Sequence, residues 1–268
     1  MAQKTPTSGI KFFLFFIFFL GFSLNLFVIL DAEWFNVLIG TGHGTNGTSG
    51  SIKTLFEKAN RSIVLVIPKG SDGSNCGSGT GFIVKPGYVA TNAHVIECSL
   101  RYEDIIVKDF RGRMHAAQIE GVARNYGKAN DLAILKISDN SLPPLTLTDS
   151  AQYESGHEGD EIVAIGYPLV GMASSADKPA VTAKGSLSTF KPDENIFIAS
   201  GMPLNAGNSG GPIFLVKTQQ VVGVAVAVLR GQVNTNLAPV EGVSYFIPAN
   251  ILAHFFEEKT GEKLSDVP

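Results

Sequence analysis

The sequence predicts an all-β fold, built either as a sandwich or as barrels. From residue 62 onward, about a dozen short segments rich in β-branched residues follow one another, separated by Gly, Pro, Asn and Asp. No long helical pattern interrupts them. The composition agrees with a packed domain, because 44% of the 268 residues are hydrophobic, 17% are charged and 29 are glycines.

The expected elements can be placed in order along the chain. A short helix is expected over residues 51–60, and an amphipathic helix that begins at a proline over residues 248–259. The expected strands lie between them, at residues 62–67, 79–85, 88–93, 104–110, 114–123, 132–137, 161–167, 181–189, 196–200, 212–216, 221–229 and 243–247. Residues 259–268 are expected to be a short C-terminal tail.

The N-terminal region has a different character from the rest of the chain. Residues 12–30 contain no charge and include eight phenylalanines, and as a helix they would span about 28 Å, close to the ~30 Å hydrocarbon core of a bilayer. Lys4 and Lys11 precede this stretch, so the positive-inside bias predicts a cytoplasmic tail at residues 1–11 and an extracytoplasmic domain after residue 30. A cleaved signal peptide is the alternative; its apolar region would usually be shorter, about 7–15 residues.

A linker is expected between this segment and the folded domain. Residues 31–50 end in a stretch of Gly, Thr and Ser with almost no apolar content, which is typical of a flexible tether. The predicted domain organisation is therefore a cytoplasmic tail, a single transmembrane anchor at 12–30, a linker at 31–50 and a catalytic-type domain at 51–258.

The charge balance and the cysteines exclude some classes of function. A net charge of −3 without a long basic run makes nucleic acid a poor candidate partner. The two cysteines, Cys76 and Cys98, lack CxxC spacing, so no metal site and no cofactor are expected. Outside the cytoplasm the pair could form a disulfide; two free buried thiols are the alternative.

A reactive serine is suggested by the glycine-rich stretch LNAGNSGGPIF at residues 204–214. A serine hydroxyl needs a base within hydrogen-bond reach, a group that orients the base, and donors for the developing oxyanion. His94 is the best candidate base because it follows a predicted strand at the rim of a barrel, and Asp131 at the start of another strand is the candidate orienting group. The order His94, Asp131, Ser209 is the order found in chymotrypsin.

Six segments resemble the successive signatures of trypsin-like serine proteases of the HtrA/Deg type, and they occur in the same order. The resemblance covers roughly residues 51–258 and implies two six-stranded antiparallel β-barrels of the chymotrypsin kind, with a catalytic triad in the cleft between them and a short C-terminal helix. The segments are GSGTGFIV (77–84), VATNAHV (89–95), NDLAILKI (130–137), AIGYP (164–168), NAGNSGGPIF (205–214) and GVSYFIPAN (242–250).

The resemblance also implies roles for individual residues. Ser209 would attack the scissile carbonyl of a polypeptide, His94 would take and return its proton, and Asp131 would hold the imidazole. The backbone N–H groups of Gly207 and Ser209, with Asn208 between them, would form the oxyanion hole.

The cysteines and the substrate pocket fit the same family. A Cys76–Cys98 bridge would staple the loop that carries His94, much as in secreted relatives. Leu204 and Val228 fall at positions that line the substrate pocket in the family. No acidic residue lies between Ile198 and Ser209, so cleavage after small or medium apolar residues is expected.

The resemblance also bears on assembly, and a second function stays open. Many relatives carry C-terminal PDZ domains, and none is expected in this chain. The relatives trimerise through the segment before the first strand, of which residues 51–60 are a short version, so a homotrimer is an expectation to test. The expected enzyme is a membrane-anchored serine endopeptidase acting in extracytoplasmic protein quality control; the alternative is a catalytically silent scaffold or chaperone that binds unfolded protein.

Overall fold

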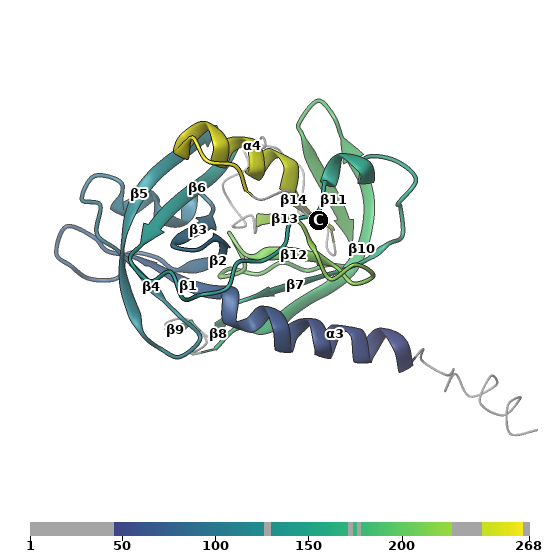
Figure 1. Cartoon of the computed structure of the whole chain (residues 1–268), viewed down its shortest axis with the longest axis horizontal. Helices are drawn as coiled ribbons and strands as arrows, with labels where there is room; N and C mark the ends of the chain where they lie inside the picture. The colour runs from purple at the N-terminus through teal and green to yellow at the C-terminus, as the bar shows by residue number, and fades with distance from the viewer. Residues whose placement is uncertain (1–45, 126–129, 171–173, 176–177, 227–242, 265–268) are drawn as a thin grey trace, which may run out of the picture. The chain divides into compact units, whose positions relative to one another are not determined.

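The structure is a computed structural model of the 268-residue chain and describes residues 46–125, 130–170, 174–175, 178–226 and 243–264 (Figure 1). Residues from Gly50 onward form one compact unit. Of the predicted organisation, residues 1–45 lie outside the described residues. Among the helices that are described, none is long and apolar enough to cross a membrane.

The first half of the domain is a closed barrel whose strand order is β1-β2-β3-β6-β5-β4. Neighbouring strands are antiparallel; β1 and β2, for example, pair Ile63 with Phe82 and Val66 with Gly79. The strands are β1 (Ile63–Pro68), β2 (Gly79–Lys85), β3 (Tyr88–Thr91), β4 (Ile105–Lys108), β5 (Met114–Asn125) and β6 (Asn130–Ile137).

The second half is a closed barrel with the order β10-β11-β14-β13-β12-β7. A two-stranded sheet of β8 (Leu169–Val170) and β9 (Ser174–Ser175) accompanies it and was not predicted. Two closed six-stranded antiparallel barrels confirm the predicted fold class. The barrel strands are β7 (Glu161–Gly166), β10 (Ala180–Lys191), β11 (Ile196–Ser200), β12 (Pro212–Leu215), β13 (Val221–Val226) and β14 (Val243–Pro248).

Short helices surround the barrels. The first described helix, α3 (Asn46–Ala59), begins five residues before the predicted start, so residues 46–50 are helical where a flexible linker was expected. Gly, Ser and Thr have weak helix propensity, but extending an existing helix avoids the cost of nucleation, since each added residue gains one hydrogen bond. The 3₁₀ helices are η1 (Asn60–Ser62), η2 (His94–Ser99) and η3 (Ser150–Tyr153).

The C-terminal helix α4 (Ala249–Thr260) joins the two barrels. It follows β14 of the second barrel and packs against β5 and β6 of the first (Figure 1). The ring of Phe256, fully buried, meets the ring of Tyr88 edge-on with centroids 5.2 Å apart. Just beyond the helix, Glu262 accepts a hydrogen bond from the Tyr88 hydroxyl at 3.2 Å and pairs with Lys85 Nζ at 2.6 Å.

The core is arranged so that β1 is buried on both faces. Val64 and Val66 belong to the apolar cluster that also contains Val89 and Leu135, inside the first barrel. The alternate residues Ile63 and Leu65 belong to a second cluster, which includes α3, α4 and residues of the second barrel such as Phe214. Because successive side chains of a strand point to opposite faces, this strand reads as a continuous apolar run instead of an alternating one.

Candidate active site

His94 and Asp131 form a close pair at the edge of the first barrel. β3 ends at Thr91 rather than at the predicted residue 93, and His94 opens η2. Asp131 lies at the start of β6. Its Oδ2 is 2.6 Å from His94 Nδ1, and its Oδ1 accepts the backbone N–H of His94 at 2.9 Å. The structure therefore brings these two predicted side chains into contact.

The pairing defines which nitrogen of the imidazole is free to act. An ionised carboxylate only accepts hydrogen bonds, so a neutral His94 carries its proton on Nδ1 and leaves the lone pair on Nε2. The His94 side chain keeps 25% of its surface exposed and that of Asp131 only 11%, so the ring is accessible and the carboxylate lies beneath it. Asn92 supports the pair, because its Nδ2 donates to the Asp131 carbonyl at 2.8 Å.

Ser209 lies in a tight turn that leads into β12. The turn is closed by the bonds Asn208 N–H to Asn205 O and Gly211 N–H to Asn208 O, each 3.0 Å. Gly207 and Gly210 have φ of 94° and 81°, the left-handed region that favours glycine. The predicted glycine-rich turn around the serine is therefore present, with Ser209 itself 5% exposed.

The turn is fastened to both barrels. Gly210 N–H donates to Ala225 O at 3.0 Å, which holds the turn on β13 of the second barrel. A Cβ at Gly210 would lie 2.2 Å from Thr91 Oγ1 and 2.9 Å from Asn92 N, so the turn touches the segment that leads into His94. Residues far apart in the sequence thus converge: His94, Asp131 and the Ser209 turn share one edge of the interface between the barrels.

The residues expected to form the oxyanion hole differ in how their polar groups are hydrogen-bonded. The Asn208 N–H donates to Asn205 O within the turn, whereas the prediction concerns the N–H groups of the residues on either side, Gly207 and Ser209. The Asn208 side chain is 2% exposed, and neither its Oδ1 nor its Nδ2 has a hydrogen-bond partner among the described residues. Sequence reasoning included Asn208 among the oxyanion-hole residues but gave its side-chain amide no role.

One of the two predicted pocket residues can be placed. Leu204 is partly buried against the apolar core of the second barrel, and its N–H donates to Ser244 Oγ at 3.3 Å. Val228 lies outside the described residues.

The two cysteines form a disulfide, so the alternative of free thiols is wrong. Cys76 and Cys98 have Cα atoms 6.3 Å apart and a separation of 22 residues in sequence. The bridge joins the segment before β2 to the end of η2, the helix that His94 opens.

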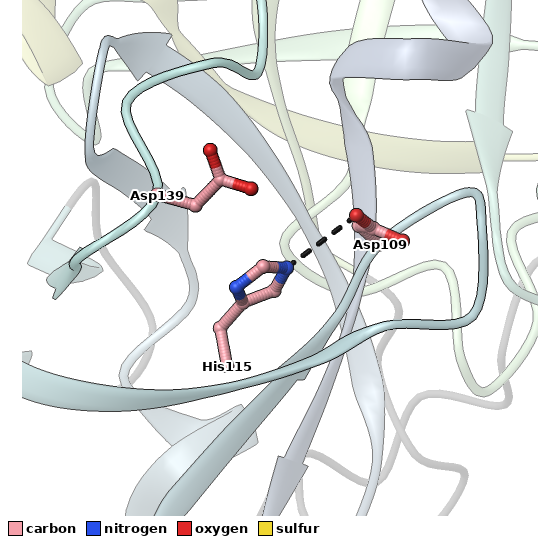
Figure 2. Close-up of side chains that lie close together, drawn as sticks. All are labelled: Asp109, His115 and Asp139. Atoms are coloured by element: carbon pink, nitrogen blue, oxygen red, sulfur yellow. Dashed lines mark hydrogen bonds and ion pairs between the residues drawn. The ribbon is translucent and has the colours of Figure 1, made fainter.

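A cluster of charged residues lies on the first barrel, where sequence reasoning saw none (Figure 2). Single ligand atoms of Asp109, His115 and Asp139 all come within 4.8 Å of one another, which is a spacing that a metal ion could use. However, Arg113 bridges the carboxylates, with Nε donating to Asp109 and a terminal nitrogen to Asp139, both at 2.9 Å, and Arg111 approaches Asp109 at 3.4 Å. With both carboxylates paired to guanidinium groups, the cluster is an ion-pair network.

Hydrogen bonds lower the pKa of one carboxyl group in this network. The pKa of Asp139 is lowered well below its usual range, first by hydrogen bonding from Ser141 and then by the guanidinium of Arg113. A sequence signal for this network was hard to find, because its members come from the β4–β5 turn, from the start of β5 and from the segment after β6.

The comparisons with known proteins agree with this geometry. The model of the family described as "Trypsin-like peptidase domain" matches residues 79–224, a span that contains His94, Asp131 and Ser209. The chain belongs to this family. This membership confirms the trypsin-like part of the resemblance that the motifs indicated.

Named relatives are similar over part of their length. A probable periplasmic serine endoprotease, DegP-like, of Chlamydia trachomatis is 37% identical over 154 residues, which are 57% of this chain and 29% of the relative. A protein of the same description in Hahella chejuensis is 34% identical over 177 residues, 65% of this chain and 34% of the relative. This chain therefore spans about a third of the length of these relatives.

A solved structure supports the fold. The crystal structure of the serine endoprotease from Yersinia pestis is similar with a TM-score of 0.61 and 24% sequence identity, covering 78% of this chain and 66% of that one. At this level of sequence identity the similarity supports the fold alone.

Proposed function

We propose that this chain is a serine endopeptidase with the triad His94, Asp131 and Ser209. The observation that carries the proposal is the 2.6 Å contact between His94 Nδ1 and Asp131 Oδ2, at the edge where the Ser209 turn packs against the residues before His94. The pair supplies an oriented base, and the turn supplies a nucleophile, which are the parts that serine acyl transfer needs.

In the proposed reaction Ser209 Oγ attacks the scissile carbonyl carbon while His94 Nε2 takes the hydroxyl proton. The imidazolium that forms is stabilised by the Asp131 carboxylate on its other side. His94 then returns the proton to the leaving amine, which departs and leaves an acyl-enzyme on Ser209. Water, deprotonated by the same imidazole, hydrolyses the ester and restores the hydroxyl.

The tetrahedral intermediate carries a negative oxygen that needs donors. The N–H groups of Gly207 and Ser209, flanking Asn208, are proposed to bind it, and the left-handed φ of Gly207 supports this turn geometry. Losing one such donor typically costs about 3–4 kcal/mol of transition-state stabilisation.

The proposed substrates are polypeptides cleaved after small or medium apolar residues such as Val or Ala. Leu204 packs on the apolar core of the second barrel, and residues 199–208 include no acid that could pair with a Lys or Arg side chain of the substrate. Val228 is proposed as a second wall of the pocket.

We place the peptidase domain outside the cytoplasm. The relatives are named as periplasmic, and the Cys76–Cys98 disulfide suits an oxidising compartment. The apolar residues 12–30 are proposed as a single membrane anchor with residues 1–11 in the cytoplasm, and a homotrimer is proposed as the assembly. Protein quality control near the membrane is the role consistent with these features.

A scaffold or chaperone that binds unfolded protein without cleaving it is the second candidate. It needs the same fold but no working oxyanion hole, so N–H groups of Gly207 and Ser209 that point away from each other would favour it.

Turnover of a peptide series separates the two candidates. Peptides that differ only in the residue before the scissile bond, from Ala and Val to Phe, Asp and Lys, would be incubated with the wild type and with Ser209→Ala. The endopeptidase predicts cleavage after Ala or Val that Ser209→Ala abolishes. Binding of unfolded protein without cleavage, equal in both forms, would establish the scaffold instead.

The anchor has a separate test. The N-terminal sequence of the mature protein, purified from membranes, is expected to begin upstream of residue 12. A mature chain that begins after residue 30 would show a cleaved signal peptide.

A further inference from the structure

Thr80, in β2 of the first barrel, makes an unusual set of contacts with the nucleophile turn of the second barrel. Its side chain is completely buried. Its N–H donates to the carbonyl of Ser209 at 2.9 Å, and its hydroxyl lies 2.6 Å from the carbonyl of Gly207. One residue thus contacts the carbonyls on both sides of Asn208.

The direction of the hydroxyl bond follows from its partners. The N–H of Tyr167, just after β7, lies 2.9 Å from Thr80 Oγ1 and can only donate. The single proton of the hydroxyl is therefore available for the Gly207 carbonyl, which can only accept. Both bonds are formed, and each links Thr80 to a backbone group of the second barrel.

The surroundings leave Thr80 little freedom to move. Its own carbonyl accepts a hydrogen bond from Thr91 Oγ1 at 2.8 Å, which ties it to the segment leading to His94. A Cβ at Gly166 would lie 2.7 Å from Thr80 Oγ1, and one at Gly210 would lie 2.3 Å from Thr80 O. The Thr80 side chain fits here because Gly166 lacks a side chain, and the Thr80 backbone can approach the turn because Gly210 lacks one too.

These contacts bear on the Ser209 N–H, one of the two amides proposed for the oxyanion hole. The peptide that joins Gly207 to Asn208 is fixed at both ends, by Thr80 at its oxygen and by Asn205 O at its nitrogen, 3.0 Å away. The carbonyl of Ser209 is fixed by the Thr80 N–H. Between them the Asn208–Ser209 peptide, which carries the Ser209 N–H, can hardly rotate.

We propose that Thr80 is a positioning residue that aligns the Ser209 N–H, one of the two proposed oxyanion donors, from the opposite barrel. This rests on the proposed peptidase function. Transition-state stabilisation by fixed dipoles depends on donors that need no rearrangement during reaction, and a displacement of about 1 Å can cost on the order of 100-fold in rate. Thr80 makes the alignment depend on the contact between the two barrels.

The test compares Thr80→Val with Thr80→Ser. Valine has nearly the same shape but leaves the Gly207 carbonyl and the Tyr167 N–H without the hydroxyl, while serine keeps it. We expect Thr80→Val to lower kcat by about 10- to 100-fold with little change in KM, because the effect is on the transition state. Thr80→Ser should retain most of the wild-type kcat.

A second readout does not depend on catalysis. Hydrogen exchange of the backbone amides in residues 204–214 should be at least about tenfold faster in Thr80→Val than in the wild type, and near the wild-type rate in Thr80→Ser. Thr148→Val is the matched control, since Thr148 is also buried and its hydroxyl accepts from Gln152 Nε2 at 3.3 Å, away from the turn. It should leave both kcat and the exchange of 204–214 unchanged.

The outcomes distinguish the proposals. Unchanged exchange at 204–214 in Thr80→Val, or a Thr80→Ser variant as impaired as Thr80→Val, would overturn the role of Thr80. A wild type that neither cleaves peptides nor reacts with a fluorophosphonate would overturn the proposed peptidase function instead, and the exchange comparison would still decide whether Thr80 holds the turn.

Discussion

Replacing Asp131 with asparagine should remove activity while leaving the geometry of the site nearly intact. The asparagine Oδ1 can still accept the backbone N–H of His94, which lies 2.9 Å from the present Oδ1. The amide nitrogen would then face His94 Nδ1, where Asp131 Oδ2 now lies at 2.6 Å. Because that nitrogen donates, it favours a deprotonated Nδ1 and moves the ring proton to Nε2.

An imidazole with its proton on Nε2 cannot take the proton of Ser209. The loss of kcat in Asp131→Asn should therefore be about 10⁴-fold, as for the equivalent change in a Ser-His-Asp triad, which corresponds to about 5.5 kcal/mol of activation free energy. The assay is the initial rate of cleavage of an Ala or Val peptide, with the melting temperature measured in parallel.

A second His–Asp pair in the chain provides the control. His157 Nδ1 and Asp160 Oδ2 lie 3.0 Å apart, outside the proposed site, so Asp160→Asn should leave kcat unchanged. If folded Asp131→Asn kept a tenth or more of the wild-type kcat, the assignment of Asp131 as the orienting carboxylate would be wrong.

Three further predictions concern stability and packing. Replacing Cys76 and Cys98 by Ala opens a 22-residue loop, so unfolding should become easier by about 3 kcal/mol, seen as a melting temperature lower by roughly 6–12 °C; no change would contradict this. Gly210→Ala should cost more stability than Gly156→Ala by about 1–3 kcal/mol in denaturant titrations, because both have positive φ but only Gly210 has backbone atoms within 3 Å of the new Cβ; equal costs would refute the packing argument. Since the folded pKa of Asp139 is lowered, its contribution is complete above an unfolded pKa of about 3.9 and is lost progressively as pH falls from there toward the folded pKa. The difference in melting temperature between Asp139→Asn and the wild type should therefore shrink between pH 6 and pH 2; a constant difference would argue against it.

The strands of both barrels could be predicted because their signals are local. Residues 79–85 and 196–200 were placed with their observed bounds, since β-branched runs end there at turn residues. The closure into two barrels could not be derived from periodicity, because β1 is buried on both faces and shows no alternation; that topology came from the family resemblance. Helix α3 begins earlier than expected because extending an existing helix avoids the cost of nucleation, which offsets weak local propensity.

The sequence predicted those residues of the candidate site whose side chains would take part in the proposed reaction. His94 and Asp131 were chosen for their position at strand ends and for their order before Ser209, and the structure brings their side chains together. Thr80 could not be singled out from the sequence, because a threonine within a strand is not part of any distinctive sequence pattern. Its importance arises from contacts across the barrel interface with residues more than a hundred positions away.

The central claim is that Ser209 is an activated nucleophile. It is tested most directly by locating the adduct of a fluorophosphonate probe. The probe phosphonylates a serine only where a base takes the hydroxyl proton and donors stabilise the oxygen. The account predicts one adduct, found by mass spectrometry on Ser209, absent from Ser209→Ala and formed much more slowly in Asp131→Asn. A folded protein that forms no adduct, or an adduct on another serine, would contradict it.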